Sequence, residues 1–237
     1  MGMVIVFFAV SILSSIVGSI CGIGGGVIIK PVLDATGIMS VSAISFLSGC
    51  TVLAMSVVSV YKNVRSKAAK LDLRIATGLA VGAAVGGVLG KTMFQSLKEA
   101  VGNEAVVGMT QALVLIAVTL GTLIYTVYKQ RIRTKTYTQI WLCVVIGILL
   151  GVMSSFLGIG GGPINLVVLA YFFSMSTKEA ALSSLYIIMF SQITSLIQTC
   201  ATGSIPKVSA AYLAAMVVGG ILGGTLGSKV NKKISEE

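Results

Sequence analysis

Seven apolar stretches, each long enough to cross a bilayer, constrain this 237-residue chain more than any other feature. A helical crossing needs about 20 predominantly apolar residues, and a backbone surrounded by lipid must satisfy its own hydrogen bonds. We therefore expect an all-α polytopic membrane protein, with residues 1–237 forming a single transmembrane domain. The stretches are residues 3–33, 41–61, 75–93, 105–128, 139–173, 180–199 and 208–230.

Composition excludes several other classes of protein. Only 10% of the residues are charged, against about 25% in an ordinary soluble domain. Histidine is absent, the seven acidic residues are scattered and the four cysteines are isolated, so we expect no enzyme, no cofactor and no metal site. The net charge of +10 comes from Lys and Arg placed mostly between apolar stretches. That placement indicates membrane topology rather than nucleic-acid binding.

The basic residues also predict an orientation. They are concentrated in the connections 62–74 and 129–135, which the positive-inside rule assigns to the cytoplasm. If each stretch crosses once, the amino terminus is inside and the carboxy terminus is outside. Lys229, Lys232 and Lys233 near the carboxy terminus fit that assignment poorly.

The first and fifth stretches are too long for one straight helix, and each contains the pentapeptide Gly-Ile-Gly-Gly-Gly. Glycine lowers helix stability by about 1 kcal/mol per residue, so we expect a broken, glycine-rich helix in each. Unwound backbone at this depth must be buried or line a cavity, and its N–H groups beside a helix start attract anions. The alternative is that the glycines only allow close helix crossing. The residues are Gly22, Ile23, Gly24, Gly25 and Gly26, and Gly158, Ile159, Gly160, Gly161 and Gly162.

The two pentapeptides belong to an internal repeat. A shift of 136 residues superposes them and also aligns Leu33 with Leu169 and Ser48 with Ser184. We expect two homologous halves, repeat 1 at about 3–128 and repeat 2 at about 139–230, the second shorter by one span. Whether the halves are parallel or inverted stays open.

Further glycines recur every four residues in the third and seventh stretches. Such stripes let helix backbones approach closely in lipid, so we expect them to pack helices rather than bind a ligand. They comprise Gly78, Gly82, Gly86 and Gly90, and Gly219, Gly223 and Gly227.

Three polar residues in the apolar stretches are further candidates for a substrate site. Lys30 follows the first pentapeptide, and an unpaired cation at such a depth costs about 2.5–3.5 kcal/mol. Attraction of an anion and a local ion pair with Asp34 explain it about equally well. Asn165 follows the second pentapeptide, and Gln192 lies in the sixth stretch, where we expect it to face a pathway.

These motifs resemble the TauE/SafE family, also called the TSUP permeases, which export sulfite and sulfonates. The resemblance lies in the first pentapeptide followed by Pro31 and Leu33, and the second followed by Pro163, in two halves. It implies a secondary transporter of small sulfur-containing anions such as sulfite, thiosulfate or organosulfonates. Its partners would be the lipid bilayer of a prokaryotic inner membrane and the anion. The chain departs from the family in placing Pro163 directly after the glycines and in having one span fewer than the usual eight.

Other functions stay open beside transport. A non-transporting scaffold or sensor would use the glycines only for packing, and Lys30→Leu would then be silent or stabilising. A cation carrier fits less well, because Asp34, directly after the first stretch, is the only plausible intramembrane carboxylate. A homodimer stays open as a way to cover the surface that an eighth span would occupy.

Overall fold

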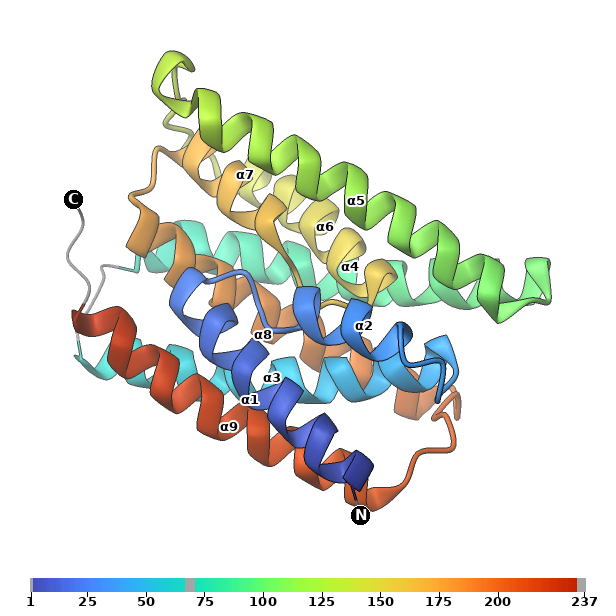
Figure 1. Ribbon diagram of the computed structural model, residues 1–237. Helices are drawn as coiled ribbons and strands as arrows, with labels where there is room; N and C mark the ends of the chain where they lie inside the picture. The colour runs from blue at the N-terminus through green and yellow to red at the C-terminus, as the bar shows by residue number, and fades with distance from the viewer. Residues whose placement is uncertain (1, 67–70, 234–237) are drawn as a thin grey trace.

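The computed structural model describes residues 2–66 and 71–233, and these residues are helical apart from short connections (Figure 1). Within them, seven helices are long and apolar enough to cross a membrane. The predicted all-α polytopic architecture is therefore confirmed. The helices are α1 (Gly2–Cys21), α2 (Gly26–Asp34), α3 (Val41–Ser66), α4 (Leu73–Val101), α5 (Glu104–Tyr128), η1 (Lys129–Arg131), α6 (Ile140–Leu157), α7 (Pro163–Phe173), α8 (Thr177–Ala201) and α9 (Ala210–Lys233).

Polar side chains and glycines mark several helix ends. The Asp72 carboxylate accepts a hydrogen bond from the N–H of Arg74 at 3.0 Å and so caps the start of α4. Ser176 and Glu179 form a capping box at the start of α8. Helix α4 ends at Gly102, whose left-handed backbone glycine adopts without strain.

The two pentapeptides lie in the connections between a long and a short helix. One leads from α1 into α2, and the other leads from α6 into α7. Their first two glycines have similar positive φ angles, +74° and +75° at Gly22 and Gly24, and +65° and +74° at Gly158 and Gly160. These values favour glycine over any other residue. The chain turns back after α1, because Gly25 lies against Ser14 of that helix.

The glycine stripes pack helices, as predicted. Along α4, Gly78, Gly82 and Gly90 lie against successive turns of α6. Along α9, Gly219, Gly223 and Gly227 lie against successive turns of α1. In both pairs the numbering rises in the same direction, so α4 runs parallel to α6 and α9 runs parallel to α1. A Cβ on most of these glycines would overlap the facing backbone.

The predicted placing of the termini is wrong. Asn231 near the end of α9 donates to the carbonyl of Ile20 at 2.6 Å, and Ser19 bonds Ser59 near the end of α3. The lysines of α9 therefore lie at the same end of the bundle as Arg65, and Figure 1 shows the connection after α5 there too. We call this the basic end. The start of α1 lies at the opposite end, where Phe7 packs on Tyr212.

The reversal after α1 explains the error. Because α2 returns toward the end at which α1 begins, the stretch 3–33 does not cross once, and counting it as one crossing exchanges the two sides. With the basic end in the cytoplasm, the carboxy-terminal lysines obey the positive-inside rule.

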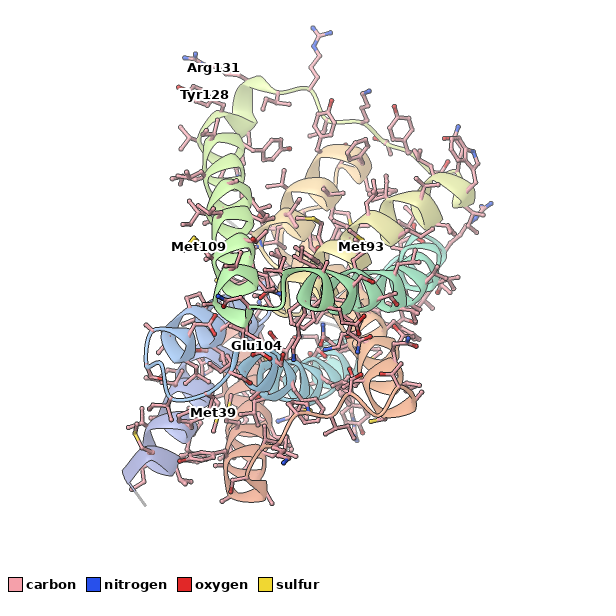
Figure 2. All side chains as sticks on the ribbon, turned by 90° about the vertical axis from the view of Figure 1, so that its right-hand side faces the viewer. Met39, Met93, Glu104, Met109, Tyr128 and Arg131 are labelled. Atoms are coloured by element: carbon pink, nitrogen blue, oxygen red, sulfur yellow. The ribbon has the colours of Figure 1, made fainter. Side chains whose placement is uncertain are left out.

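Helix α5 runs along the outside of the bundle. Figure 2 shows it extending from Glu104 to Tyr128 and Arg131, with Met109 pointing away from the other helices. Most of its apolar side chains are exposed and suit contact with lipid. Only Val107 and Gln111 of α5 are buried, so Gln111 is the one polar side chain that this helix contributes to the interior.

Candidate functional site

The two glycine-rich connections meet inside the bundle. We name residues 22–26 glycine loop 1 and residues 158–162 glycine loop 2. Gly26 lies so close to Ile159 that a Cβ there would overlap the Ile159 carbonyl, and a Cβ on Gly24 would lie 3.6 Å from the Gly160 oxygen. The structure thus brings together two groups of five predicted site residues, the two pentapeptides, which are 136 positions apart in the sequence.

Each glycine loop contacts a long helix, at positions that are equivalent under the shift of 136 residues. A Cβ on Gly22 would lie 2.5 Å from the Cβ of Ala181 in α8, and one on Gly158 would lie 2.7 Å from the Oγ of Ser45 in α3. Position 181 is the counterpart of position 45 under the shift of 136. Reciprocal contacts of this kind are typical of a two-fold arrangement.

Among the described residues, several buried polar groups have no hydrogen-bond partner, and those of Ser15, Ser45 and Asn165 belong to residues next to a glycine loop. Asn165, at the start of α7, is fully buried, and neither its Oδ1 nor its Nδ2 has a hydrogen-bond partner. Its Nδ2 lies beside Gly161. An unsatisfied buried polar group costs about 1–3 kcal/mol, so these groups call for a functional explanation. The buried hydroxyls without a partner are those of Ser15, Ser45, Ser48, Ser183 and Ser184.

A small polar cavity adjoins glycine loop 2. Its volume is about 10 Å³, room for about one water molecule. Gln192 is buried in its wall, with Oε1 facing Gly49 and Nε2 donating to Ser154 Oγ at 3.4 Å. An anion larger than water therefore requires side chains to move. We name this space the inner cavity; its walls include Ser45, Gly49, Lys91, Phe94, Gln111, Ser155, Gly158, Gln192, Ser195 and Thr199.

Lys30 is buried, and its partners are neutral. Its ammonium donates to the side-chain Oε1 of Gln111 and to the Leu157 carbonyl, the latter at 2.9 Å. Leu157 is the last residue of α6, where the negative end of the helix dipole favours a cation. Among the described residues the ion pair with Asp34 does not form, because the one salt bridge within 4.0 Å joins Lys98 and Glu104.

Comparison with known proteins decides the family. The family model described as "Sulfite exporter TauE/SafE" matches residues 7–237. The chain belongs to the TauE/SafE family. Members of this family are membrane transporters of sulfur-containing anions rather than enzymes, so this TauE/SafE chain is a multi-pass membrane transporter embedded in a lipid bilayer. Neither the curated proteins nor the solved structures searched gave a match.

Two polar residues that line cavities of this TauE/SafE chain, Gln111 and Lys91, were not identified as site residues from the sequence. Gln111 binds Lys30 and also donates through Nε2 to the Phe156 carbonyl at 2.5 Å. It lines both the inner cavity and a second cavity of about 190 Å³ beside Lys30 and Asp34. An amide in the middle of an apolar stretch is a signal that could have found it. The second residue is Lys91, at the end of the third apolar stretch, which lies in the wall of the inner cavity.

A wider space lies next to the inner cavity, toward the end opposite the basic end, and shares the lining residues Lys91 and Phe94 with it. This space, which we name the vestibule, has a volume of about 320 Å³. Its walls come from the end of α4, the start of α3 and the connection after α8. The vestibule residues are Ser42, Lys91, Phe94, Gln95, Lys98, Glu99, Gly203, Ser204, Ile205 and Pro206.

In the described part of this TauE/SafE chain, no three His, Cys, Asp or Glu side chains are grouped so that they could hold a metal ion.

Proposed function

We propose that this chain is a secondary exporter that carries small sulfur-containing anions, such as sulfite, thiosulfate or organosulfonates, across a prokaryotic inner membrane. The observation that carries the proposal is the meeting of the two glycine loops beside buried polar groups that have no partner among the described residues. Family membership supplies the class of substrate.

The anion would bind between the glycine loops. Backbone N–H groups of unwound glycines and the start of α7 offer donors without requiring a side chain. Asn165 and Gln192 would add amide donors from α7 and α8. Lys30 would contribute mainly its positive charge, because two of the three donors that an ammonium offers are occupied by Gln111 and Leu157.

We further propose that the chain consists of two inverted halves, each with a helix broken at its glycine loop. The parallel pairs α1 with α9 and α4 with α6, and the reciprocal contacts of Gly22 and Gly158, support this arrangement. In transporters of this design the substrate site lies at the interface of the repeats, and rocking of one half against the other exposes it to each side in turn.

The experiment that tests the function is flux of sulfite into proteoliposomes containing the purified protein. We expect saturable uptake that thiosulfate and sulfonates inhibit, and loss of uptake in Gly25→Val, because a side chain there would press on Ser14 and Ser15 of α1. Liposomes with folded, correctly inserted protein but without saturable uptake would contradict the proposal.

The tight packing at Gly26 favours one second candidate, a non-transporting scaffold or sensor in which the glycine loops only join the halves. That function predicts no specific anion binding. It also predicts that replacing Lys30 by Leu leaves the protein's activity in the cell unchanged.

A further inference from the structure

Lys91 is a cation without a counterion. It lies on α4 and is partly buried, and its ammonium sits over the ring of Phe94, 5.2 Å from the centroid. In the described part of the chain no carboxylate lies within 4.0 Å of it, whereas Lys98, two turns further on, pairs with Glu104 at 2.5 Å. The basic side chains that interact electrostatically with Lys91 are Lys98 and Lys30. Lys98 has Glu104 and Lys30 has Asp34 as an acidic neighbour, so among these three cations Lys91 is the one without an adjacent carboxylate in the described part of the chain.

Lys91 also occupies a special position between the cavities. Of the residues that the structure describes, only Lys91 and Phe94 line both the inner cavity and the vestibule. Lys91 is therefore placed to meet a solute in either of these two spaces. The two side chains together form what we name the neck.

The vestibule beside the neck offers further donors. Gln95 Nε2 is buried and has no hydrogen-bond partner. The Ser42 hydroxyl and the Lys98 ammonium also line the vestibule, and each of them already bonds Glu104. Glu99 is the other carboxylate in the walls, and at an exposed position its charge is screened by solvent. Lys91 is therefore the cation best placed to meet an anion.

We propose that Lys91 is a second anion-binding residue, which holds a small oxyanion at the neck as it passes between the inner cavity and the vestibule. This inference rests on the proposed function and extends it to a site outside the glycine loops. When the neck is empty, the Phe94 ring holds the ammonium by a cation–π contact. An oxyanion replaces that weak contact with a charge-assisted hydrogen bond, which is roughly twice as strong as a neutral one.

The test compares Lys91→Gln and Lys91→Arg in proteoliposome counterflow of sulfite at low ionic strength. The glutamine variant removes the charge, and we expect its half-saturation concentration to rise about tenfold, which corresponds to one charge-assisted hydrogen bond. The arginine variant keeps the charge, so its half-saturation concentration should stay within about threefold of that of the unchanged protein. The control is Lys207→Gln, which removes an exposed charge next to the vestibule residue Pro206 and should change nothing.

The outcomes separate this inference from the proposed function. If the unchanged protein shows saturable sulfite flux but Lys91→Gln keeps the same half-saturation concentration, the neck site is wrong and the proposed function stands. If the unchanged protein shows no flux, both are wrong. If Lys91→Gln fails to insert into the membrane, sulfite flux through the unchanged protein is measured at increasing ionic strength instead. The neck site requires the half-saturation concentration to rise with ionic strength. A constant half-saturation concentration overturns the neck site.

Discussion

Gly158 of glycine loop 2 packs directly against Ser45 of α3, so that a Cβ on Gly158 would lie 2.7 Å from the Ser45 Oγ. Its counterpart Gly22 has the same relation to Ala181 of α8. Glycine loop 2 thus packs on α3 and glycine loop 1 packs on α8, at positions that are 136 residues apart. A substitution in either loop should therefore disturb the long helix against which the loop packs.

Glycine at position 26 is required by the contact between the loops. We expect Gly26→Ala to destabilise the folded protein by about 2–4 kcal/mol, in the range of other strained core substitutions, because its Cβ would overlap the Ile159 carbonyl. Thermal unfolding in detergent measures the change. Gly121→Ala is the matched control, because a Cβ there meets open space. Alanine favours the helix over glycine, so the stability of this variant should equal or slightly exceed that of the unchanged protein. Equal stability of the two variants would show that the loops are not in contact.

Asn165 separates binding from packing. Replacing it by Leu removes two buried polar atoms that have no partner, so we expect the stability to stay the same or to rise by about 1 kcal/mol. Sulfite flux should nevertheless fall by at least about tenfold, the effect of losing one good hydrogen bond. Unfolding and flux are measured on the same preparation. A stable variant with full flux would remove Asn165 from the site.

Gln111 holds the buried Lys30 ammonium. Gln111→Leu leaves that ammonium with only the Leu157 carbonyl and takes a donor from Phe156. We expect a loss of stability of about 3–5 kcal/mol, as for other buried charges that lose a partner. Gln139→Leu provides the comparison, because Gln139 is exposed and its side chain makes no capping bond. If both variants unfold at the same temperature, Lys30 does not depend on Gln111.

The orientation of the chain can be tested with reporters. With the basic end in the cytoplasm, we expect green fluorescent protein fused after Lys233 to fluoresce, and alkaline phosphatase fused there to be inactive. Because α1 begins at the opposite end, a reporter before Gly2 should lie outside the cell. Two fluorescent fusions would mean that α2 does not return beside α1.

Much of the fold follows from residue patterns. Apolar length predicts the seven long helices, and the pentapeptides mark the two places where a long helix gives way to a short one. The glycine stripes of α4 and α9 predict close packing, which the contacts with α6 and α1 confirm. These features are local, so the spacing of residues is enough to reveal them.

The parts that could not be predicted depend on direction and on distant partners. Hydropathy measures how long a stretch is but not that the chain turns back at Gly22, so the ends of the chain were predicted at the wrong ends of the bundle relative to the basic connections. Lys30 could equally have paired with Asp34, and only tertiary packing brings Gln111 of α5 to it instead. The sequence shows Lys91 only as a lysine near the end of an apolar stretch. Its place at the neck depends on how α4 packs against α3 and α8.

The central claim is that an anion binds between the two glycine loops. Isothermal titration of sulfite into the purified protein in detergent, beside Asn165→Leu, tests it most directly. The account predicts saturable binding to the unchanged protein and at least about tenfold weaker binding to the variant, equivalent to about 1.4 kcal/mol. Absence of binding to folded protein, or equal binding to both, would contradict it.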